Sequence, residues 1–320
     1  LLEKKILLKY KKKIITDIRY VQELTERKYF KKATYFKFMD DTTSPRKLFA
    51  IARQIIDKGI DAKWETYVRM EMPFQNEEKM KLLYAGGCRK LMWGLETNDP
   101  EILKNMNKKV DAVSPSKVLE ASFNAGILNF AFVLIGFPGE VDSQREQLIE
   151  FIARTKAINV LTVSTFDVTK ASPMQSSLME NNPWHLECDD PEGFEVRLVY
   201  TINGENWKKK IVKYAQKFML DVSKMRPDVA LVSLFPDQVR GILTEKHDNK
   251  WGSTFLNDFG EENIRKMLHA TEEYIDAFES TGSDEIELSY LPDPIKREHF
   301  RTKDDIDAIS RAIARRKSYE

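Results

Sequence analysis

Strand and helix signals alternate through the first half of the chain, and this alternation limits the fold more than any other feature. Short apolar or aromatic runs predict strands at residues 33–39, 63–69, 89–95, 127–135 and 160–166. The segments between them have apolar residues at helical spacing, and another helix is predicted at residues 11–27. Because the strands recur about every thirty residues, as in βαβ units, the chain is predicted to form a parallel α/β sheet, open or barrel-like.

Several of the predicted helices begin at residues that favour helix starts. Asn76 and Ser114 are expected to cap the helices that follow them, and Asp142 is expected to cap the helix before the last strand. In the helix after the first strand, Ile56 is expected to face the core with the other apolar residues. These local signals support the helix boundaries independently of the strand pattern.

Charge and composition exclude several classes of protein. The chain has 51 lysine and arginine residues against 50 aspartate and glutamate residues, so the net charge is +1. This balance gives no electrostatic basis for non-specific binding to nucleic acid or membranes. The longest apolar run, residues 127–137, is about half a membrane span, and no signal peptide is evident at the start. Two cysteines, Cys88 and Cys188, exclude a disulfide scaffold and favour a cytoplasmic location.

The second half of the chain has a different pattern. Residues 181–204 are polar and rich in turn formers, and helices are predicted at 207–225, 261–278 and 302–317. We therefore expect two domains, an α/β domain over 1–180 and a mostly helical domain over 181–320. The run Lys208-Lys209-Lys210 is expected to be a solvated helix face.

The loops after the strands are the expected ligand site, since parallel α/β folds bind ligands at the carboxyl ends of their strands. Asp40-Asp41 could bind a metal, a ribose or an amine, or cap the next helix. Arg69 could hold a carboxylate or make an ordinary ion pair. Glu96 would project into the loop region or lie on the surface, and the loop at Gly136 could approach a nucleotide or be a plain tight turn.

The order of these segments resembles the radical S-adenosylmethionine (radical SAM) superfamily, over about residues 11–174. The likeness is strongest to the branch that often carries an N-terminal cobalamin-binding domain. It implies a partial (βα)6 TIM-like barrel, of which this chain holds strands two to six and lacks the first. The segments that carry it are Phe38-Met39-Asp40-Asp41, 64–69, Ala85-Gly86-Gly87-Cys88-Arg89-Lys90-Leu91, Trp93-Gly94-Leu95-Glu96-Thr97, 102–108, Ala125-Gly126-Ile127, Leu134-Ile135-Gly136-Phe137-Pro138-Gly139-Glu140 and 169–174.

The resemblance implies an enzyme that reductively cleaves S-adenosylmethionine at a [4Fe-4S] cluster to start radical chemistry, with cobalamin-dependent methylation as one outcome. The implied partners are a small-molecule or peptide substrate and a reductant such as flavodoxin or ferredoxin. By position, Asp40 and Asp41 would lie beside the methionine moiety. The other implied contacts are Arg69, Glu96 and Lys108 to the amino acid or ribose, and Gly136 and the backbone near Thr165 along the adenine.

One departure from the family is large. Its cluster needs Cys-x3-Cys-x2-Cys, because thiolates hold the irons, and this sequence has no such triplet. Cys88 is expected to be a core residue at the start of a strand, and His185 with Cys188 is a weak pair, so no metal ligand is predicted here. We expect the cluster ligands and the first strand upstream of Leu1, which would make this chain a fragment of a longer enzyme. Phe132 stands where some relatives place a carboxylate for the ribose.

Two alternatives remain open at this point. The chain could be a cluster-less barrel that binds S-adenosylmethionine, a nucleoside or a protein partner without catalysis. It could also be an unrelated α/β enzyme with a metal held by Asp40, Asp41 and Glu96. Nucleoside binding without any iron requirement would favour the first alternative, and a divalent-metal-dependent activity would favour the second.

Overall fold

The computed structural model describes residues 2–29, 31–39, 42–108, 113–180, 182–189, 197–263 and 266. Residues Leu1–Ile264 form one compact unit and Arg265–Glu320 a second, and all helices and strands with described bounds lie in the first. Asp40, Asp41, the helix expected at 302–317 and most of the helix expected at 261–278 lie outside the described residues. The expected division into domains near residue 180 stays a prediction.

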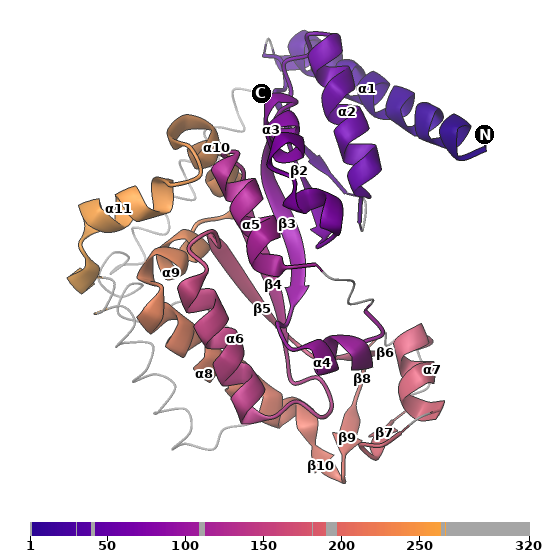
Figure 1. The fold of residues 1–320 in the computed structure, drawn as a ribbon, viewed down its shortest axis with the longest axis vertical. Helices are drawn as coiled ribbons and strands as arrows, with labels where there is room; N and C mark the ends of the chain where they lie inside the picture. Colours follow the sequence, from indigo (N-terminus) through magenta and orange to yellow (C-terminus); the bar gives the residue numbers. More distant parts are fainter. Residues whose placement is uncertain are drawn as a thin grey trace, which may run out of the picture. The chain divides into compact units, whose positions relative to one another are not determined.

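A five-stranded parallel sheet organises the first unit (Figure 1). Its strands lie side by side in chain order, each preceded by a helix, which confirms the predicted parallel α/β fold. The strand predicted at 63–69 has those bounds, and the others begin or end within two residues of the prediction. The strands are β1 (Tyr35–Phe38), β2 (Lys63–Arg69), β3 (Cys88–Glu96), β4 (Leu128–Ile135) and β5 (Val160–Thr165).

One face of the sheet, here called the outer face, is covered by α2 (Pro45–Asp57), α3 (Glu77–Ala85), α5 (Pro115–Asn124) and α6 (Asp142–Arg154). The long helix α1 (Leu2–Tyr29) packs against α2, and the short helix η1 (Met72–Gln75) packs against α5. The apolar sides of these helices meet alternate strand residues such as Trp64, Leu91 and Trp93 in the main core. Burial of this apolar area is the principal stabilising term for the layer.

Two predicted helix starts are confirmed, and two predictions are wrong. The side chains of Asn76 and Ser114 accept hydrogen bonds from the backbone N–H groups three residues on. Asp142 is not the cap but the first residue of α6, because Val141 has the extended backbone of the N-cap. Ile56 is 43% exposed. It lies about 100° round α2 from its neighbour Ile55, which is buried, and so falls outside the buried stripe.

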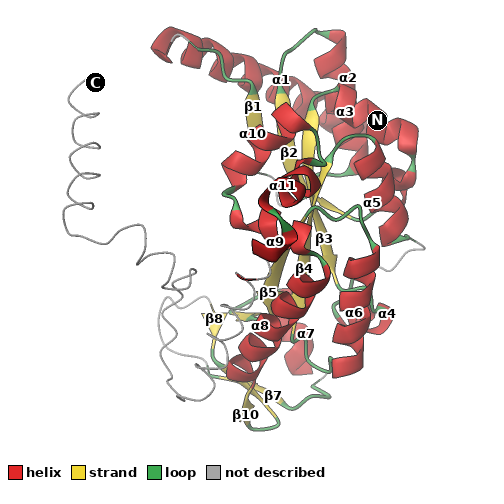
Figure 2. Cartoon of the chain, turned by 90° about the vertical axis from the view of Figure 1, so that its left-hand side faces the viewer, coloured by secondary structure: helices red, strands yellow, loops and turns green. Residues whose placement is uncertain are grey.

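The opposite face of the sheet, here called the inner face, is partly covered by the last described helices (Figure 2). Helix α8 (Trp207–Met225) precedes them and extends the outer layer, because it packs beside α6 and on β5 and its buried residues Phe218 and Val222 join the main core. The chain then continues through α9 (Pro227–Leu234), α10 (Asp237–His247) and α11 (Trp251–Phe259). Met92, Phe130 and Val160 of the strands meet Val232 and Trp251 of these helices in a separate core. No helix among the described residues is both long and apolar enough to span a membrane.

An insertion between β5 and α8 builds a third core. The sequence reading described residues 181–204 only as polar and turn-rich, and it missed three short strands there: those at 186–188 and 200–202 pair with each other, and that at 197–198 pairs with the strand at 168–169. Strands of two or three residues are too short to show an alternating pattern. The elements are α4 (Pro100–Asn105), which packs on the insertion, and β6 (Val168–Thr169), α7 (Pro173–Glu180), β7 (Leu186–Cys188), β8 (Arg197–Leu198), β9 (Tyr200–Ile202) and β10 (Glu205–Asn206).

Candidate functional site

The strand register places residues of four strands in one row across the carboxyl half of the inner face. Arg69 of β2 pairs with Gly94 of β3, Gly94 with Phe132 of β4, and Phe132 with Thr162 of β5. Residues in register on neighbouring parallel strands point to the same side of the sheet. This row, Arg69–Gly94–Phe132–Thr162, is the base on which the candidate site is built.

Glu96 is turned back over this row by an irregular strand end. The register between β3 and β4 shifts between Gly94 and Glu96, and Glu96 has a φ of 61°. A positive φ is uncommon for a residue with a side chain and marks a backbone held in place by its surroundings. One carboxylate oxygen of Glu96 lies 3.2 Å from the position that a Cβ on Gly94 would take. The missing side chain of Gly94 therefore makes room for the carboxylate.

Lys108 pairs with this carboxylate, as an ion pair between its Nζ and Oε1 of Glu96. The lysine follows α4, and its backbone N–H donates to the carbonyl of Leu103 at 2.9 Å. The sequence predicted both residues as ligand contacts, and the structure brings them together. Within the described part of the chain the second oxygen of Glu96 has no hydrogen-bond donor, so the pair offers an acceptor and a cation side by side.

Arg69 ends β2 with an exposed side chain, and no hydrogen bond or ion pair is recorded for it among the described residues. The pKa of the nearby Glu71 is raised by partial burial, which outweighs the opposite effect of the Arg69 charge. Arg69 therefore presents its guanidinium at the same edge as Glu96. The position of this arginine relative to Asp40 and Asp41 lies outside the described residues.

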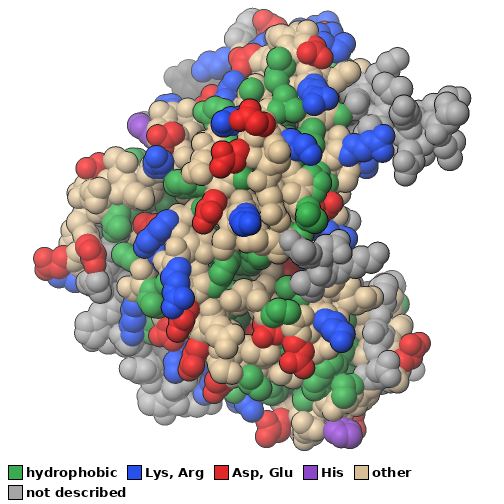
Figure 3. Space-filling model, viewed as in Figure 1, with side chains coloured by type: hydrophobic (Ala, Val, Ile, Leu, Met, Phe, Trp, Pro, Cys, Tyr) green, Lys and Arg blue, Asp and Glu red, His purple; other side chains and the backbone are tan. Residues whose placement is uncertain are grey.

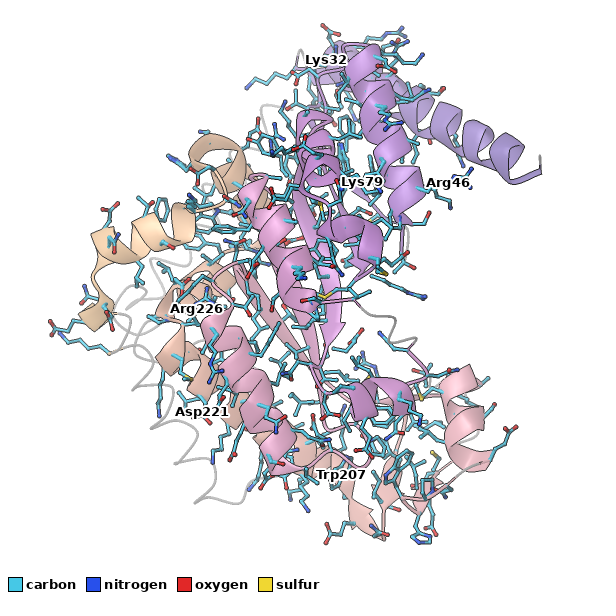
Figure 4. The ribbon with its side chains drawn as sticks, viewed as in Figure 1. Lys32, Arg46, Lys79, Trp207, Asp221 and Arg226 are labelled. Atoms are coloured by element: carbon cyan, nitrogen blue, oxygen red, sulfur yellow. The ribbon has the colours of Figure 1, made fainter. Side chains whose placement is uncertain are left out.

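Gly136 lies directly after β4, and its surroundings are tightly packed. It has a φ of 83°, and a Cβ there would lie 2.3 Å from Cγ2 of Ile211 on α8. Its N–H donates to Oε2 of Glu140 at 2.7 Å, and its carbonyl accepts from Nε1 of Trp207 at 2.9 Å (Figure 4). Both backbone polar groups of Gly136 are thus bonded within the chain.

The buried carboxylate of Glu140 fixes this turn by accepting hydrogen bonds. Its Oε2 also accepts from Nη1 of Arg145 at 3.1 Å, and the Arg145 guanidinium lies 4.1 Å from the ring centroid of Tyr214. Burial raises the pKa of the Glu140 carboxyl, and the hydrogen bonds from Gly136 and Arg145 offset part of that rise. The turn after β4 is therefore a fixed platform between the sheet and α8.

Thr165 ends β5 next to charged residues that the sequence reading missed. Its Oγ1 accepts from Nζ of Lys208 at 3.0 Å, and Lys208 also pairs with Asp167. Arg197 lies 3.6 Å from the other oxygen of Asp167. Lys208 was expected on a solvated helix face, but it reaches back from the first turn of α8 to the strand end. No sequence pattern connects it to Asp167, 41 residues earlier.

Neither cysteine lies where an iron–sulfur cluster could be built from these residues. Cys88 is fully buried at the amino end of β3, as expected, and burial raises the pKa of its thiol. Cys188 lies in β7, and no group of three histidine, cysteine, aspartate or glutamate side chains in the described part of the chain could hold a metal ion. The residues present do not fit a [4Fe-4S] cluster, which needs three thiolates.

The charged side chains on the face shown in Figure 3 do not gather into a further candidate site. Acidic and basic side chains are intermixed there, with apolar side chains between them. This mixture agrees with the near-zero net charge of the chain. The polar residues at the carboxyl ends of β2, β3 and β5 therefore form the candidate site.

Comparison with known proteins shows which protein family the chain resembles. A family model described as the radical SAM superfamily matches residues 8–152, which include β1 to β4 and most of α6. Residues 8–152 are therefore similar to the radical SAM superfamily, and the match confirms the resemblance inferred from the order of the loops.

The particular relatives are distant. A Pyrococcus horikoshii protein described as the uncharacterized methyltransferase PH0819 is 27% identical over 135 residues, which are 42% of this chain and 29% of that protein. The radical SAM methyltransferase TsrM of Kitasatospora setae, solved with cobalamin and a [4Fe-4S] cluster, is similar at 16% identity and a TM-score of 0.43 over 64% of this chain and 45% of TsrM. The cobalamin-dependent enzyme OxsB, solved with aqua-cobalamin, is similar at 11% identity and a TM-score of 0.49 over 83% of this chain and 50% of OxsB. The chain matches half or less of each of these proteins.

Proposed function

We propose that this chain binds S-adenosylmethionine at the carboxyl ends of β2 to β5, as part of a radical SAM enzyme. Similarity to the superfamily implies this ligand. The observation that carries the proposal is the position of the Glu96 carboxylate. It lies against Gly94, which is in register with Arg69, and it pairs with Lys108. This arrangement offers an acceptor and two cations to a ligand that carries an ammonium, a carboxylate and ribose hydroxyls.

Each residue has a proposed part in binding. Arg69 would hold the carboxylate of the amino acid, and the free oxygen of Glu96 would accept from the ammonium or a ribose hydroxyl. Lys108 would hold the Glu96 carboxylate in one orientation through their ion pair. Asp40 and Asp41 are proposed to lie beside the methionine moiety, as the resemblance implies.

The adenine is proposed to lie on the far side of the row, over β4 and β5. Gly136 supports that side through close packing, because its own N–H and carbonyl are bonded to Glu140 and Trp207. The backbone near Thr165 would supply the polar contacts, and Lys208 would keep the Thr165 hydroxyl oriented.

The radical chemistry needs a [4Fe-4S] cluster that the residues present do not fit, so no step of the reaction is assigned to this chain. We propose that the complete enzyme holds the cluster through other residues, receives electrons from a reductant such as flavodoxin or ferredoxin, and acts on a small-molecule or peptide substrate. Methyl transfer is the proposed outcome, because the P. horikoshii relative is described as a methyltransferase. Cobalamin enters this proposal through the resemblance to the cobalamin-associated branch.

A second candidate function is a barrel that binds S-adenosylmethionine or a nucleoside without catalysis. It is favoured by one observation, that the described residues contain no group of three metal-binding side chains. Both candidates place the ligand at the same site, and they differ in whether an iron–sulfur cluster is needed.

Isothermal titration with S-adenosylhomocysteine, which cannot be cleaved, tests the shared claim. Glu96→Gln should weaken binding about tenfold or more, because a charge-assisted hydrogen bond is lost. Glu101→Gln is the matched control, since Glu101 lies exposed on α4 outside the row. Absence of binding to the unaltered chain, or equal affinities of the two variants, would refute the proposal.

A further inference from the structure

The amino half of the inner face holds a partly buried cluster of ion pairs. Lys90 is fully buried, and its Nζ lies 2.9 Å from Glu65 and 2.7 Å from Asp237. Lys37 lies 2.9 Å from Asp237 and 3.5 Å from Glu65, and Arg240 lies 3.3 Å from Asp237. Asp237, which begins α10, therefore neutralises cations from two strands and from its own helix. We call these five residues the ion cluster.

The ion cluster lies where α10 approaches the sheet most closely. A Cβ on Gly241 of α10 would lie 2.9 Å from the ring of Tyr35 on β1, so only glycine fits there without movement. The Tyr35 hydroxyl donates to Oε2 of Glu65 at 2.9 Å. Near the other end of α10, Glu245 pairs with Arg89 at 2.8 Å, and the two side chains are 37% and 12% exposed. The helix is thus bound to the sheet at both ends, and the ion cluster lies at its amino end, at Asp237 and Arg240.

Three aromatic rings on the inner face connect the ion cluster to the row over which Glu96 folds. We call Tyr67, Phe130 and Phe132 the aromatic floor, because Phe132 is itself part of the row. The ring centroids of Tyr67 and Phe132 are 5.9 Å apart, and those of Phe130 and Phe132 are 4.8 Å apart. Every cation of the ion cluster stands over one of these rings: Lys37 over Tyr67 at 5.3 Å, Lys90 over Phe130 at 5.9 Å and Arg240 over Phe130 at 5.0 Å.

We propose that Asp237 is a positioning residue for the candidate site: it holds α10 and the three cations beneath the aromatic floor, and so fixes the rings on which the ligand lies. The part of the test that measures ligand affinity rests on the proposed function. Without the Asp237 carboxylate, Lys37 and Lys90 would share one anion, Glu65, and Arg240 would lose its ion-pair partner. Mutual repulsion and loss of a buried partner would move the cations and α10, and the rings would lose their support.

The experiment compares Asp237→Asn with Glu245→Gln, which removes the other ion pair between the same helix and β3. Hydrogen exchange should become at least tenfold faster in α10 of Asp237→Asn and stay near the unaltered rate in Glu245→Gln. Spectra of the chain labelled with 13C-phenylalanine, assigned through Phe130→Leu and Phe132→Leu, should show both floor signals shifted in Asp237→Asn alone. The affinity for S-adenosylhomocysteine should fall about three- to tenfold in the same variant, and Asp237→Glu should restore part of it.

The outcomes separate a positioning role from a merely structural one. Faster exchange in α10 with unchanged phenylalanine signals would show that Asp237 only clamps the helix, and would overturn the proposal. Equal effects of Asp237→Asn and Glu245→Gln would overturn it as well. If the unaltered chain fails to bind S-adenosylhomocysteine, the proposed function fails, and the phenylalanine signals alone decide whether Asp237 positions the floor.

Discussion

Replacement of Arg226 by methionine should destabilise the first unit strongly. The side chain is 1% exposed and begins the turn into α9 (Figure 4). Its Nη1 donates to the carbonyls of Ile152 and Thr155 at 3.0 and 2.9 Å, and its Nη2 donates to the carbonyl of Ile158 at 2.7 Å. Ile152 lies in the last turn of α6, where carbonyl groups lack partners within the helix, so the guanidinium also caps that helix.

The size of the effect follows from the groups that lose a partner. Hydrogen bonds to a charged group contribute about 1.5–3 kcal/mol each, and they are not additive. Removal of one member of a buried polar network commonly costs about 3–5 kcal/mol, which we take as the expected loss for Arg226→Met. The carboxylate of Asp228, held by Arg226 at 2.8 Å, would also lose its partner, although part of it reaches solvent.

Urea unfolding followed by circular dichroism measures this loss. For a unit of this size a slope of about 3 kcal/mol per molar urea is expected, so the midpoint should fall by about 1–1.7 M. The urea midpoint of Arg226→Lys should lie between those of the unaltered chain and Arg226→Met, because an ammonium cannot reproduce the planar fork of the guanidinium. Arg154→Met is the control, since that arginine pairs with Glu150 on the exposed side of α6. A loss for Arg226→Met no larger than for Arg154→Met would refute the reasoning.

Two further predictions concern the turn after β4 and the ion cluster. Gly136→Ala should destabilise the fold by about 1–3 kcal/mol more than Gly204→Ala, because both glycines have a positive φ but a Cβ meets Ile211 only at Gly136; equal urea midpoints of the two variants would contradict this. For Asp237, burial alone would raise the pKa, but hydrogen bonds from Lys90 and then Lys37 outweigh it and lower the pKa to about 2. Its ion pairs should therefore stabilise the fold fully above the unfolded pKa of 3.8 and be lost as the pH falls through about 2. The difference in urea midpoint between the unaltered chain and Asp237→Asn should shrink as the pH falls below about 4, and a difference that is constant from pH 7 to pH 2.5 would contradict the assignment.

The sheet could be predicted from the sequence because its signals are local. β4 is a nearly continuous apolar run, as expected for a strand covered on both faces, and Asn76 and Ser114 mark helix starts within a few residues. Arg69 and Glu96 were proposed as site residues because each lies at the end of a predicted strand, and Lys108 was proposed through the family resemblance. The pairing of Glu96 with Lys108 could not be predicted from composition or spacing, since it depends on the positive φ of Glu96.

The contacts that the sequence did not reveal join distant parts of the chain. Lys90 and Asp237 are 147 residues apart, and Lys208 reaches Asp167 across 41 residues. Such pairs depend on how α8 to α10 fold back on the sheet, and no local pattern encodes that path. The small strands β7 to β10 were missed for a different reason, because each is too short to show a period.

A crystal structure of the chain with S-adenosylhomocysteine would test the central claim most directly. The proposal predicts the ligand at the carboxyl ends of the strands, with its carboxylate within hydrogen-bond distance of Arg69 and its ammonium or ribose hydroxyls within that distance of Glu96. The adenine should lie over β4 and β5, next to Thr165. A ligand bound elsewhere on the chain, or in contact with neither Arg69 nor Glu96, would contradict the assignment of this edge of the sheet as the site.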